Sequence, residues 1–453
     1  MKSGLIIILI FSFLFLPGLT LGKTDSIAFE IQHSFKEHLL KPWYPRALDQ
    51  EYGGFLSDFT ADWKPEGPQN KAIVTQARHL WTISQAGMAF PESTQYVQWA
   101  RHGFRFLREK MWDNEYGGFF QILNRKGEAD FNSEYGDEKR AYGNAFGIFA
   151  CTAYYQFTKD SLGLDLAKKA FWWLDSHAHD SLHGGYFQNL KRDGTVIPRH
   201  DPFAKGFDRE TAGFKDYNSS IHLLEAFTAL YKIWPDSLLR IRLSEMFYLI
   251  RDVMVSPQGS LRLYFLPDWT PISYQDSSES VRLAHLFLDH VTFGHDVETA
   301  YLLLEASHTL GIAQDTTTLR IAKKMVDHAI RFGWDRRYGG LYAMGYRSPH
   351  SDTVFLVDRP KEWWIQAEAL HAFLLMAKLF PEEPKYFAYF KKQWEYMKRY
   401  VIDTQRGGWY WAGLDTHPEF RNQNKGSEWK ATYHETRALL NCIRWLRTKN
   451  AIF

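Results

Sequence analysis

Three histidines in separate segments of the chain stand beside residues that could help them move protons. His222 follows Asn218 by four residues and His295 precedes Glu298 by three, spacings that place each pair on one face of a helix. The third, His434, lies in the segment WKATYHETR. Because imidazole titrates near neutrality, each ring can give and take protons. The set predicts one shared acid–base site in which Glu298 orients His295; three separate structural histidines are the alternative.

Other side chains are suited to holding a sugar. Trp363 and Trp364 are adjacent in the segment KEWWIQAEAL, so both cannot face the core of one helix and one of them is available for stacking. Arg78 lies in the otherwise apolar helical segment TQARHLW, where an unpaired guanidinium would be costly. It should therefore contact a ligand oxygen or, alternatively, a carboxylate of the protein. Tyr142, in AYGNAF, is a further candidate.

Metal chemistry has no signature in this sequence. No HExxH or paired-cysteine spacing occurs, so we predict no metal; a zinc site held by the histidines is the rival interpretation. The two cysteines, Cys151 and Cys442, both lie in helix-like segments. Their separation leaves open a disulfide and a pair of buried free thiols.

A recurring glycine motif determines how these residues must be positioned. Its first glycines fall at 53, 117, 184, 259, 339 and 407, and the copy at 259 is degenerate. A glycine pair followed by aromatic residues predicts a tight turn that enters a short strand, because glycine tolerates a positive φ. The copies are EYGGF, EYGGFF, LHGGYF, PQGSL, RYGGLY and QRGGWY.

Between the motifs lie paired stretches with helical periodicity. In the clearest stretches apolar residues recur at three and four positions: 141–155, 162–178, 219–234, 238–255, 362–380 and 386–401. Units of this kind cannot bury their apolar faces alone, whereas six in a closed ring can. The sequence predicts an all-α protein, a single (α/α)6 barrel over residues 23–453 with short hairpins at one end. The ligand site is expected at one end of the inner helices.

Composition excludes several classes of partner. The net charge is +2 with no run of like charge, which argues against nucleic acid and anionic membranes. Aromatic residues make up 17% of the chain, which is more than a core ordinarily needs. This suits a protein whose aromatic side chains stack on sugar rings. Residues 1–22 resemble a signal peptide, with Lys2 before an apolar run too short to span a bilayer. We therefore expect a secreted or periplasmic protein with no membrane contact after cleavage.

Six motifs in order across nearly the whole chain resemble the N-acylglucosamine 2-epimerase superfamily, and most of all its cellobiose 2-epimerase branch. They are TQARHLW, AYGNAF, NSSIHLLEAF, FGHDVETAYLL, KEWWIQAEAL and KATYHETRALL. The resemblance implies an (α/α)6 barrel that needs no metal or redox cofactor and interconverts glucose and mannose at a reducing end. It implies that Arg78, Tyr142, Asn218, Trp364 and Trp429 contact the sugar.

The same resemblance implies roles for the histidines. His295 and His434 would form the acid/base pair, Glu298 would support His295, and His222 would assist ring opening. The doubled tryptophan leaves a one-residue ambiguity between Trp363 and Trp364. We expect a monomer or weak dimer that epimerises cellobiose; mannobiose, N-acetylglucosamine and mannose are alternative substrates.

Two other classes of function remain open at this stage. A glycoside hydrolase needs two carboxyl groups flanking the bond, and Asp208, Glu210 and Asp216 are available in one short segment. A non-catalytic sugar-binding protein would use the same aromatic residues. The hydrolase would leave the three histidines unexplained, whereas binding without turnover that survives replacement of His295 and His434 would favour the binding protein.

Overall fold

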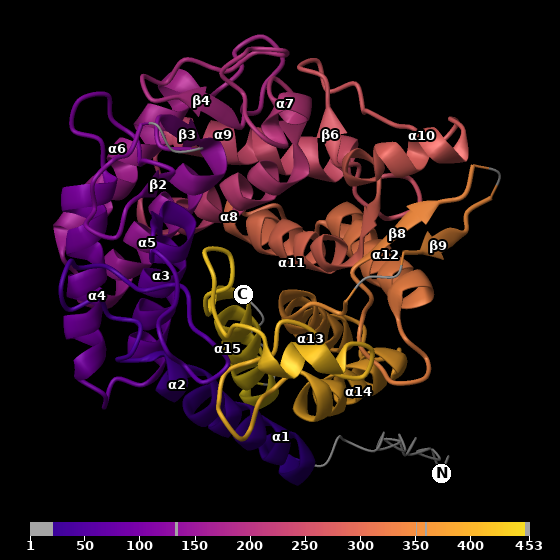
Figure 1. Ribbon diagram of the computed structural model, residues 1–453. Helices are drawn as coiled ribbons and strands as arrows, with labels where there is room; N and C mark the ends of the chain where they lie inside the picture. Colours follow the sequence, from indigo (N-terminus) through magenta and orange to yellow (C-terminus); the bar gives the residue numbers. More distant parts are fainter. Residues whose placement is uncertain (1–20, 132–134, 350, 358–359, 449–453) are drawn as a thin grey trace, which may run out of the picture.

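The computed structural model describes residues 21–131, 135–349, 351–357 and 360–448. Six helices of this part of the chain form an inner ring (Figure 1). They are α3 (Ile73–Ala89), α5 (Ala141–Thr158), α8 (Tyr217–Ile233), α11 (Phe293–Leu310), α13 (Trp363–Leu379) and α15 (Tyr433–Arg447). Consecutive members pack on one another, and α15 packs back on α3, so the ring is closed.

A second set of helices packs outside the first and runs antiparallel to it. Each inner helix has its outer partner: α4 on α3, α6 on α5, α9 on α8, α12 on α11, α14 on α13 and α1 on α15. The bounds are α1 (Leu21–Ser34), α4 (Gln95–Phe106), α6 (Ser161–His177), α9 (Ser237–Tyr248), α12 (Thr316–Gly333) and α14 (Lys385–Tyr400). Short π-helical turns, Phe35–Leu40, Leu107–Met111 and Leu249–Met254, extend α1, α4 and α9. The predicted (α/α)6 barrel is confirmed.

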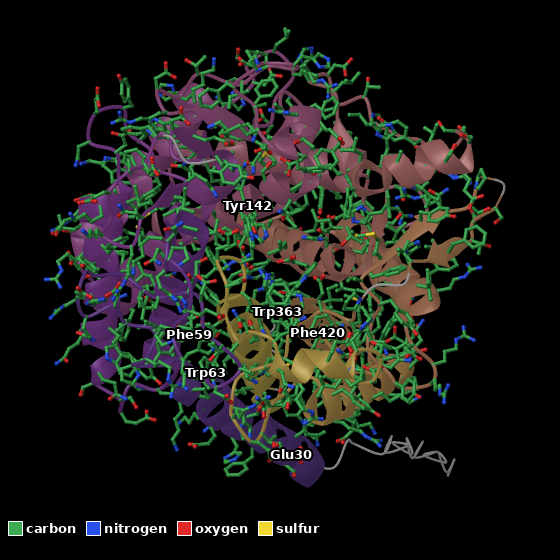
Figure 2. The ribbon with its side chains drawn as sticks, viewed as in Figure 1. Glu30, Phe59, Trp63, Tyr142, Trp363 and Phe420 are labelled. Carbon is green, nitrogen blue, oxygen red and sulfur yellow. The ribbon has the colours of Figure 1, made fainter. Side chains whose placement is uncertain are left out.

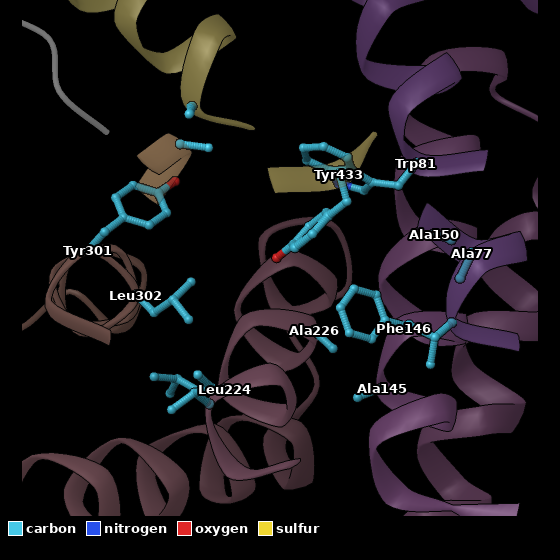
Figure 3. Close-up of a cluster of buried hydrophobic side chains, with 14 of the residues drawn as sticks. Ala77, Trp81, Ala145, Phe146, Ala150, Leu224, Ala226, Tyr301, Leu302 and Tyr433 are labelled. Atoms are coloured by element: carbon cyan, nitrogen blue, oxygen red, sulfur yellow. The ribbon is translucent and has the colours of Figure 1, made fainter. Parts of the chain in front are cut away.

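The inner helices are buried nearly all round because they lie between the outer helices and the axis of the ring. In α13, for example, thirteen of seventeen residues are buried. Outer helices bury one face only, as in α12, whose buried residues recur at three and four positions. One continuous apolar core therefore joins both layers. Figure 3 shows part of it, where Trp81, Phe146 and Tyr433 meet from α3, α5 and α15.

The glycine motifs form the turns that were expected. Both glycines of each intact pair have positive φ, as Gly117 (69°) and Gly118 (71°) do. After each of the six turns one residue bridges back across the turn, and the degenerate copy does so through Val255 and Leu261. A side chain at Gly118 would also collide with Trp173. The motif thus recurs because the chain must reverse its direction within a few residues after each outer helix.

A buried ion pair accompanies five of these turns. The aspartate that opens the turn receives a hydrogen bond from a lysine that precedes the next inner helix, over 2.6–2.9 Å. The pairs are Asp49–Lys71, Asp113–Lys139, Asp180–Lys215, Asp335–Lys361 and Asp403–Lys425. In the degenerate copy both partners are gone together, with Ser256 for the aspartate and Val291 for the lysine. Losing both avoids a buried charge without a partner.

Short strands lie at the end of the barrel where the inner helices begin. Before four of the inner helices, α3, α5, α8 and α11, a strand pairs antiparallel with a strand that follows the next glycine turn. The pairs are β1 (Lys71–Ala72) with β2 (Ile122–Leu123), β3 (Glu138–Arg140) with β4 (Asn189–Lys191), β5 (Lys215–Asp216) with β6 (Tyr264–Phe265), and β7 (Val291–Thr292) with β8 (Met344–Arg347). A third strand, β9 (Val354–Leu356), is added to β8, and α7 (Asp208–Thr211) and α10 (Glu279–Ala284) lie in the longest connections.

The structure bears on two further expectations. Cys151 and Cys442 are buried free thiols, so the open question of a disulfide is answered against it. No helix among the described residues is long and apolar enough to cross a membrane. The expected leader, residues 1–22, lies almost entirely outside the described residues and stays a prediction.

Candidate active site

The residues singled out from the sequence gather where the inner helices begin. Arg78 is on α3, Tyr142 on α5, Asn218 and His222 on α8, His295 and Glu298 on α11, Trp364 on α13 and His434 on α15. Each lies within the first two turns of its helix, so the ring brings six separate segments to one end of its axis. Trp429 lies in the loop before α15. Tyr142 is labelled near the centre of the ring in Figure 2.

Trp364 lies between two of the histidines. The centre of its ring is 4.6 Å from that of His295 and 5.4 Å from that of His434. Its indole nitrogen donates to Glu362 Oε2 over 2.6 Å, which fixes the plane of the ring. Trp363 instead is buried and packs on Trp411. The one-residue ambiguity is therefore resolved: Trp364 faces the site and Trp363 the core.

His434 is held by a carboxylate that the sequence did not identify as a site residue. Its Nδ1 lies 2.7 Å from Glu368 Oε1, and Glu368 Oε2 is bonded to His371 over 2.7 Å. All three side chains are buried. With Nδ1 donating to the carboxylate, the neutral ring presents its Nε2 lone pair as the base.

Beneath the histidines, Arg437 joins three buried glutamates. Its Nη1 donates to Glu225 Oε1 over 2.5 Å, and its Nη2 donates to Glu368 Oε1 over 2.6 Å and also to Glu298. Tyr433 donates to Glu225 as well, over 2.5 Å. A guanidinium can satisfy several carboxylates because its five N–H groups point in fixed, divergent directions.

The contact expected between Glu298 and His295 is wrong. His295 Nδ1 is hydrogen-bonded to Thr292 Oγ1 over 2.9 Å, whereas Glu298 turns inward to Arg437 and lies 3.9 Å from His434. The three-residue spacing allowed the expected pair. The buried guanidinium from another repeat competes for the same carboxylate and offers it a stronger, charge-assisted bond.

His222 has a carboxylate partner on its own helix. Its Nδ1 lies 3.1 Å from Glu225 Oε2, three residues along α8. The ring of Tyr142 packs edge-on at 5.1 Å, and the side chain of Asn218 is hydrogen-bonded to Tyr142. The rings of His222 and His434 both contact that of Tyr433, with centres 6.3 and 4.7 Å away. The three histidines therefore belong to one cluster.

Arg78 has no carboxylate partner among the described residues. It donates to the backbone oxygen of Trp429 over 2.6 Å and to Tyr142 Oη over 3.0 Å, and its guanidinium lies over the rings of Phe146 and Tyr433. Its Nε is buried without a hydrogen-bond partner. Of the two expectations for Arg78, the internal ion pair is not found, which leaves a cation free to meet ligand oxygens.

Protein surroundings keep the histidines neutral at neutral pH. Burial lowers the pKa of His434 to about 3, although its bond to Glu368 acts in the opposite direction. Desolvation, together with charge on His222 and His434, holds the pKa of His295 well below its usual range. Burial also lowers the pKa of His222, and Glu225 opposes the shift. Each ring is thus unprotonated in the free protein and keeps a nitrogen lone pair.

The two central carboxyl groups have pKa values shifted in opposite directions. Burial and the nearby charge of Glu368 raise the pKa of Glu298 to about 8. Burial would also raise the pKa of Glu368, but Arg437 and His371 outweigh it and hold that pKa well below the usual range. Glu298 therefore holds a proton more tightly than Glu368 does.

Glu298, Glu368 and His434 also offer three ligand atoms within 4.8 Å of one another, close enough to hold a metal ion. Arg437 Nη2 already donates to both carboxylates, however, and brings a positive charge between them. A cation there would have to displace or repel this guanidinium. The charge balance supports a carboxylate pair held by arginine.

Five residues of the site were missed by sequence reasoning, and most of them carried a signal. Glu225 and Glu368 each lie three residues from a histidine inside an apolar helix. Arg437 also lies inside a helix with apolar residues, and a buried arginine there requires carboxylates from elsewhere in the chain. The threonine precedes its helix and carried no signal. The residues are Glu225, Thr292, Glu368, Tyr433 and Arg437.

Comparison with known proteins agrees with this geometry. Residues 53–438 match the family described as N-acylglucosamine 2-epimerase (GlcNAc 2-epimerase). The chain belongs to this family. A cellobiose 2-epimerase from Bacteroides fragilis is 27% identical over 415 residues, covering 91% of this chain and 98% of that protein. A D-mannose isomerase from Marinomonas mediterranea is 24% identical, covering 92% and 98%.

Solved structures of the N-acylglucosamine 2-epimerase family agree in fold. The structure of cellobiose 2-epimerase from Spirochaeta thermophila superposes with a TM-score of 0.79 at 28% identity, covering 95% of this chain and 99% of that one. The protein is therefore a carbohydrate epimerase or isomerase.

Proposed function

We propose that the protein inverts C2 of the reducing-end sugar of a β-1,4-linked disaccharide, converting cellobiose to 4-O-β-D-glucopyranosyl-D-mannose. The reaction proceeds by proton transfer through a cis-enediolate and uses no metal. The single observation that carries the proposal is the placement of His295 and His434 against Trp364, at 4.6 and 5.4 Å. A sugar stacked on this indole would have an imidazole within reach at two separate positions around C2.

The chemistry requires an open-chain sugar. In that form the C1 carbonyl acidifies the C2 hydrogen, and one histidine removes this proton to give the enediolate. The other histidine returns a proton to C2 on the opposite face, and the configuration is inverted. Return of the proton to C1 instead would give the ketose, which is the reaction of an aldose–ketose isomerase.

Arg78 is suited to stabilise the charge that develops at O1. It is a buried guanidinium that the described residues do not neutralise, and its neighbour Tyr142 adds a neutral donor. Preorganised donors of this kind supply about 3–4 kcal/mol of transition-state stabilisation in comparable sites. His222, held by Glu225, is placed to relay the proton that ring opening requires.

Glu298 has a role that differs from the one first expected. Its pKa is raised, so it holds a proton more tightly than Glu368 does and reduces the negative charge of the cluster. When His434 acts, it takes or returns a proton at Nε2, because its Nδ1 already carries the proton donated to Glu368. Glu368 then stabilises the imidazolium that forms when His434 takes a proton.

Exposed rings support a second sugar subsite. Trp429, whose backbone oxygen accepts from Arg78, has a side chain that is 44% exposed. On another side, ring contacts lead from His295 through Tyr217 and Tyr264 to the exposed Phe207, at 4.8, 6.3 and 6.4 Å. A monosaccharide has no need of rings this far from the histidines. This favours a disaccharide over free mannose and N-acetylglucosamine; mannobiose remains the nearest alternative.

The test is incubation of the purified chain with cellobiose in deuterated water without added metal, followed by NMR at the reducing-end C2. Glucosyl-mannose with deuterium at C2 is expected, and His434→Ala and His295→Ala should abolish it. His200→Ala, an exposed histidine outside the cluster, is the matched control and should retain full rate. No exchange with cellobiose, mannobiose, mannose or N-acetylglucosamine would refute the proposal.

The hydrolase alternative loses support from the roles of its carboxylates. Asp216 caps α8 by accepting from Ser219, and Asp208 is paired with Arg140, while Glu210 is exposed. Two of the three are thus engaged in holding the structure. Release of glucose in the same NMR experiment would reinstate the hydrolase, and binding that survives both histidine substitutions without turnover would favour a sugar-binding protein.

A further inference from the structure

A large groove among the described residues lies on the outer wall, away from the histidines. It is a groove of about 850 Å³ between α14, the turn at 335–340 and α1. Figure 2 shows Glu30, which lines it, on the outer rim, whereas Tyr142 lies near the centre. The groove is therefore separate from the candidate active site.

Positive charge in this groove is not balanced. Its three acidic residues are already paired: Asp335 with Lys361, and Glu30 and Glu395 with Lys398. Five cations that line it form no ion pair with a carboxylate among the described residues, and all five are exposed: Arg336, Arg337, Lys391, Lys392 and Arg399. The lining therefore has a local excess of positive charge, although the whole chain carries only +2, and these five cations come from two segments about 55 residues apart.

Aromatic rings accompany these cations. Tyr338 is 40% exposed and contacts Tyr400 edge-on at 6.3 Å. Arg337 lies over the ring of Tyr338 at 4.9 Å and Arg399 over that of Tyr400 at 5.2 Å. These ring contacts orient the guanidinium groups along the groove. Their N–H groups can still pair with carboxylates.

We propose that this groove binds an acidic polysaccharide, a linear chain of uronate residues. Sugar faces would stack on the tyrosine rings while their carboxylates pair with the arginines and lysines. A concave groove with a floor of buried rings fits a linear polymer better than a flat bilayer. Membership in a family that acts on carbohydrates favours a glycan over a polynucleotide. Bound in this way, the polymer would hold the enzyme near glycan without entering the catalytic site.

The experiment measures binding of the full chain to polygalacturonate by calorimetry at low and at physiological salt. The triple variant R337E/K391E/K392E should weaken binding at least tenfold, and Y338A should weaken it severalfold. The matched control R101E/R105E/K110E reverses three exposed cations on and after α4 and should bind as the parent does. Activity on the disaccharide should be unchanged in all of these variants. Unchanged activity also shows that the variants fold.

Three outcomes would overturn the proposal. One is an absence of binding to polygalacturonate at low salt. Another is equal weakening by the two triple variants, since that would reflect net charge alone. The third is equal or tighter binding of single-stranded DNA at physiological salt, which would mark the groove as a general polyanion surface. None of these outcomes bears on the proposed epimerase activity, because each is a measurement of binding that does not involve the catalytic reaction.

Discussion

His434 Nδ1 lies 2.7 Å from Glu368 Oε1, and the two residues come from neighbouring inner helices 66 positions apart in the sequence. The same carboxylate holds His371 and Arg437. Glu368 is therefore the point where a proton-transfer residue is tied to the buried charge network. In the proposed reaction it would act through His434 and not on the sugar, which makes it a positioning residue.

Replacing Glu368 with glutamine should lower kcat by about 100-fold while KM for the disaccharide changes little. An amide keeps the shape but cannot stabilise an imidazolium, so the histidine is a poorer proton carrier. Steady-state kinetics with the pH profile of kcat measures this, and the profile should move as well as fall. A kcat within twofold of the parent would show that the contact is structural only.

The ring of Trp429 should distinguish disaccharides from monosaccharides. Trp429→Ala keeps the backbone oxygen that accepts from Arg78 and removes only the exposed indole. We expect kcat/KM for cellobiose to fall about tenfold, equivalent to about 1.4 kcal/mol of stacking, with little change for mannose. Equal losses for both sugars would place Trp429 at the reducing-end subsite instead.

Acid should destabilise the fold through buried histidines. Burial lowers the pKa of His79 to about 3, well under its unfolded value near 6.5. The unfolded chain then binds more protons, so the stability from neutral His79 is complete above about pH 6.5. It is lost progressively as pH falls towards 3. The drop in Tm from pH 7 to pH 5 should be smaller in His79→Gln than in the parent, by roughly 1–3 °C. An equal drop in both proteins would contradict the assignment.

The buried turn pairs can be tested at Lys215. Its Nζ donates to Asp180 over 2.7 Å and to the backbone oxygens of Gly184 and Pro267 over 2.6 Å. Lys215→Met should cost about 3–5 kcal/mol because it leaves a buried carboxylate alone. The double variant with Asp180→Asn should recover part of this loss. Urea unfolding measures both, and a single variant as stable as the parent would show that the pair is dispensable.

Sequence determined the architecture because the architecture is local and repeated. Each glycine turn follows from a few adjacent residues, and each helix from apolar periodicity within one segment. The predicted segment 362–380, for instance, is observed as Trp363–Leu379. A closed ring buries the apolar faces of all six units, so it could be predicted without knowledge of any long-range contact.

The partners of the site residues were decided only by the tertiary structure. Spacing along one helix suggested that Glu298 would hold His295, but Arg437 arrives from another repeat and takes that carboxylate, leaving Thr292 to bond the ring. Whether Trp363 or Trp364 faces the histidines likewise depends on the rotation of α13 in the ring. Sequence thus specified which groups could do chemistry. Which of them touch depends on competition among buried charges drawn from distant segments, where the strongest pairing wins.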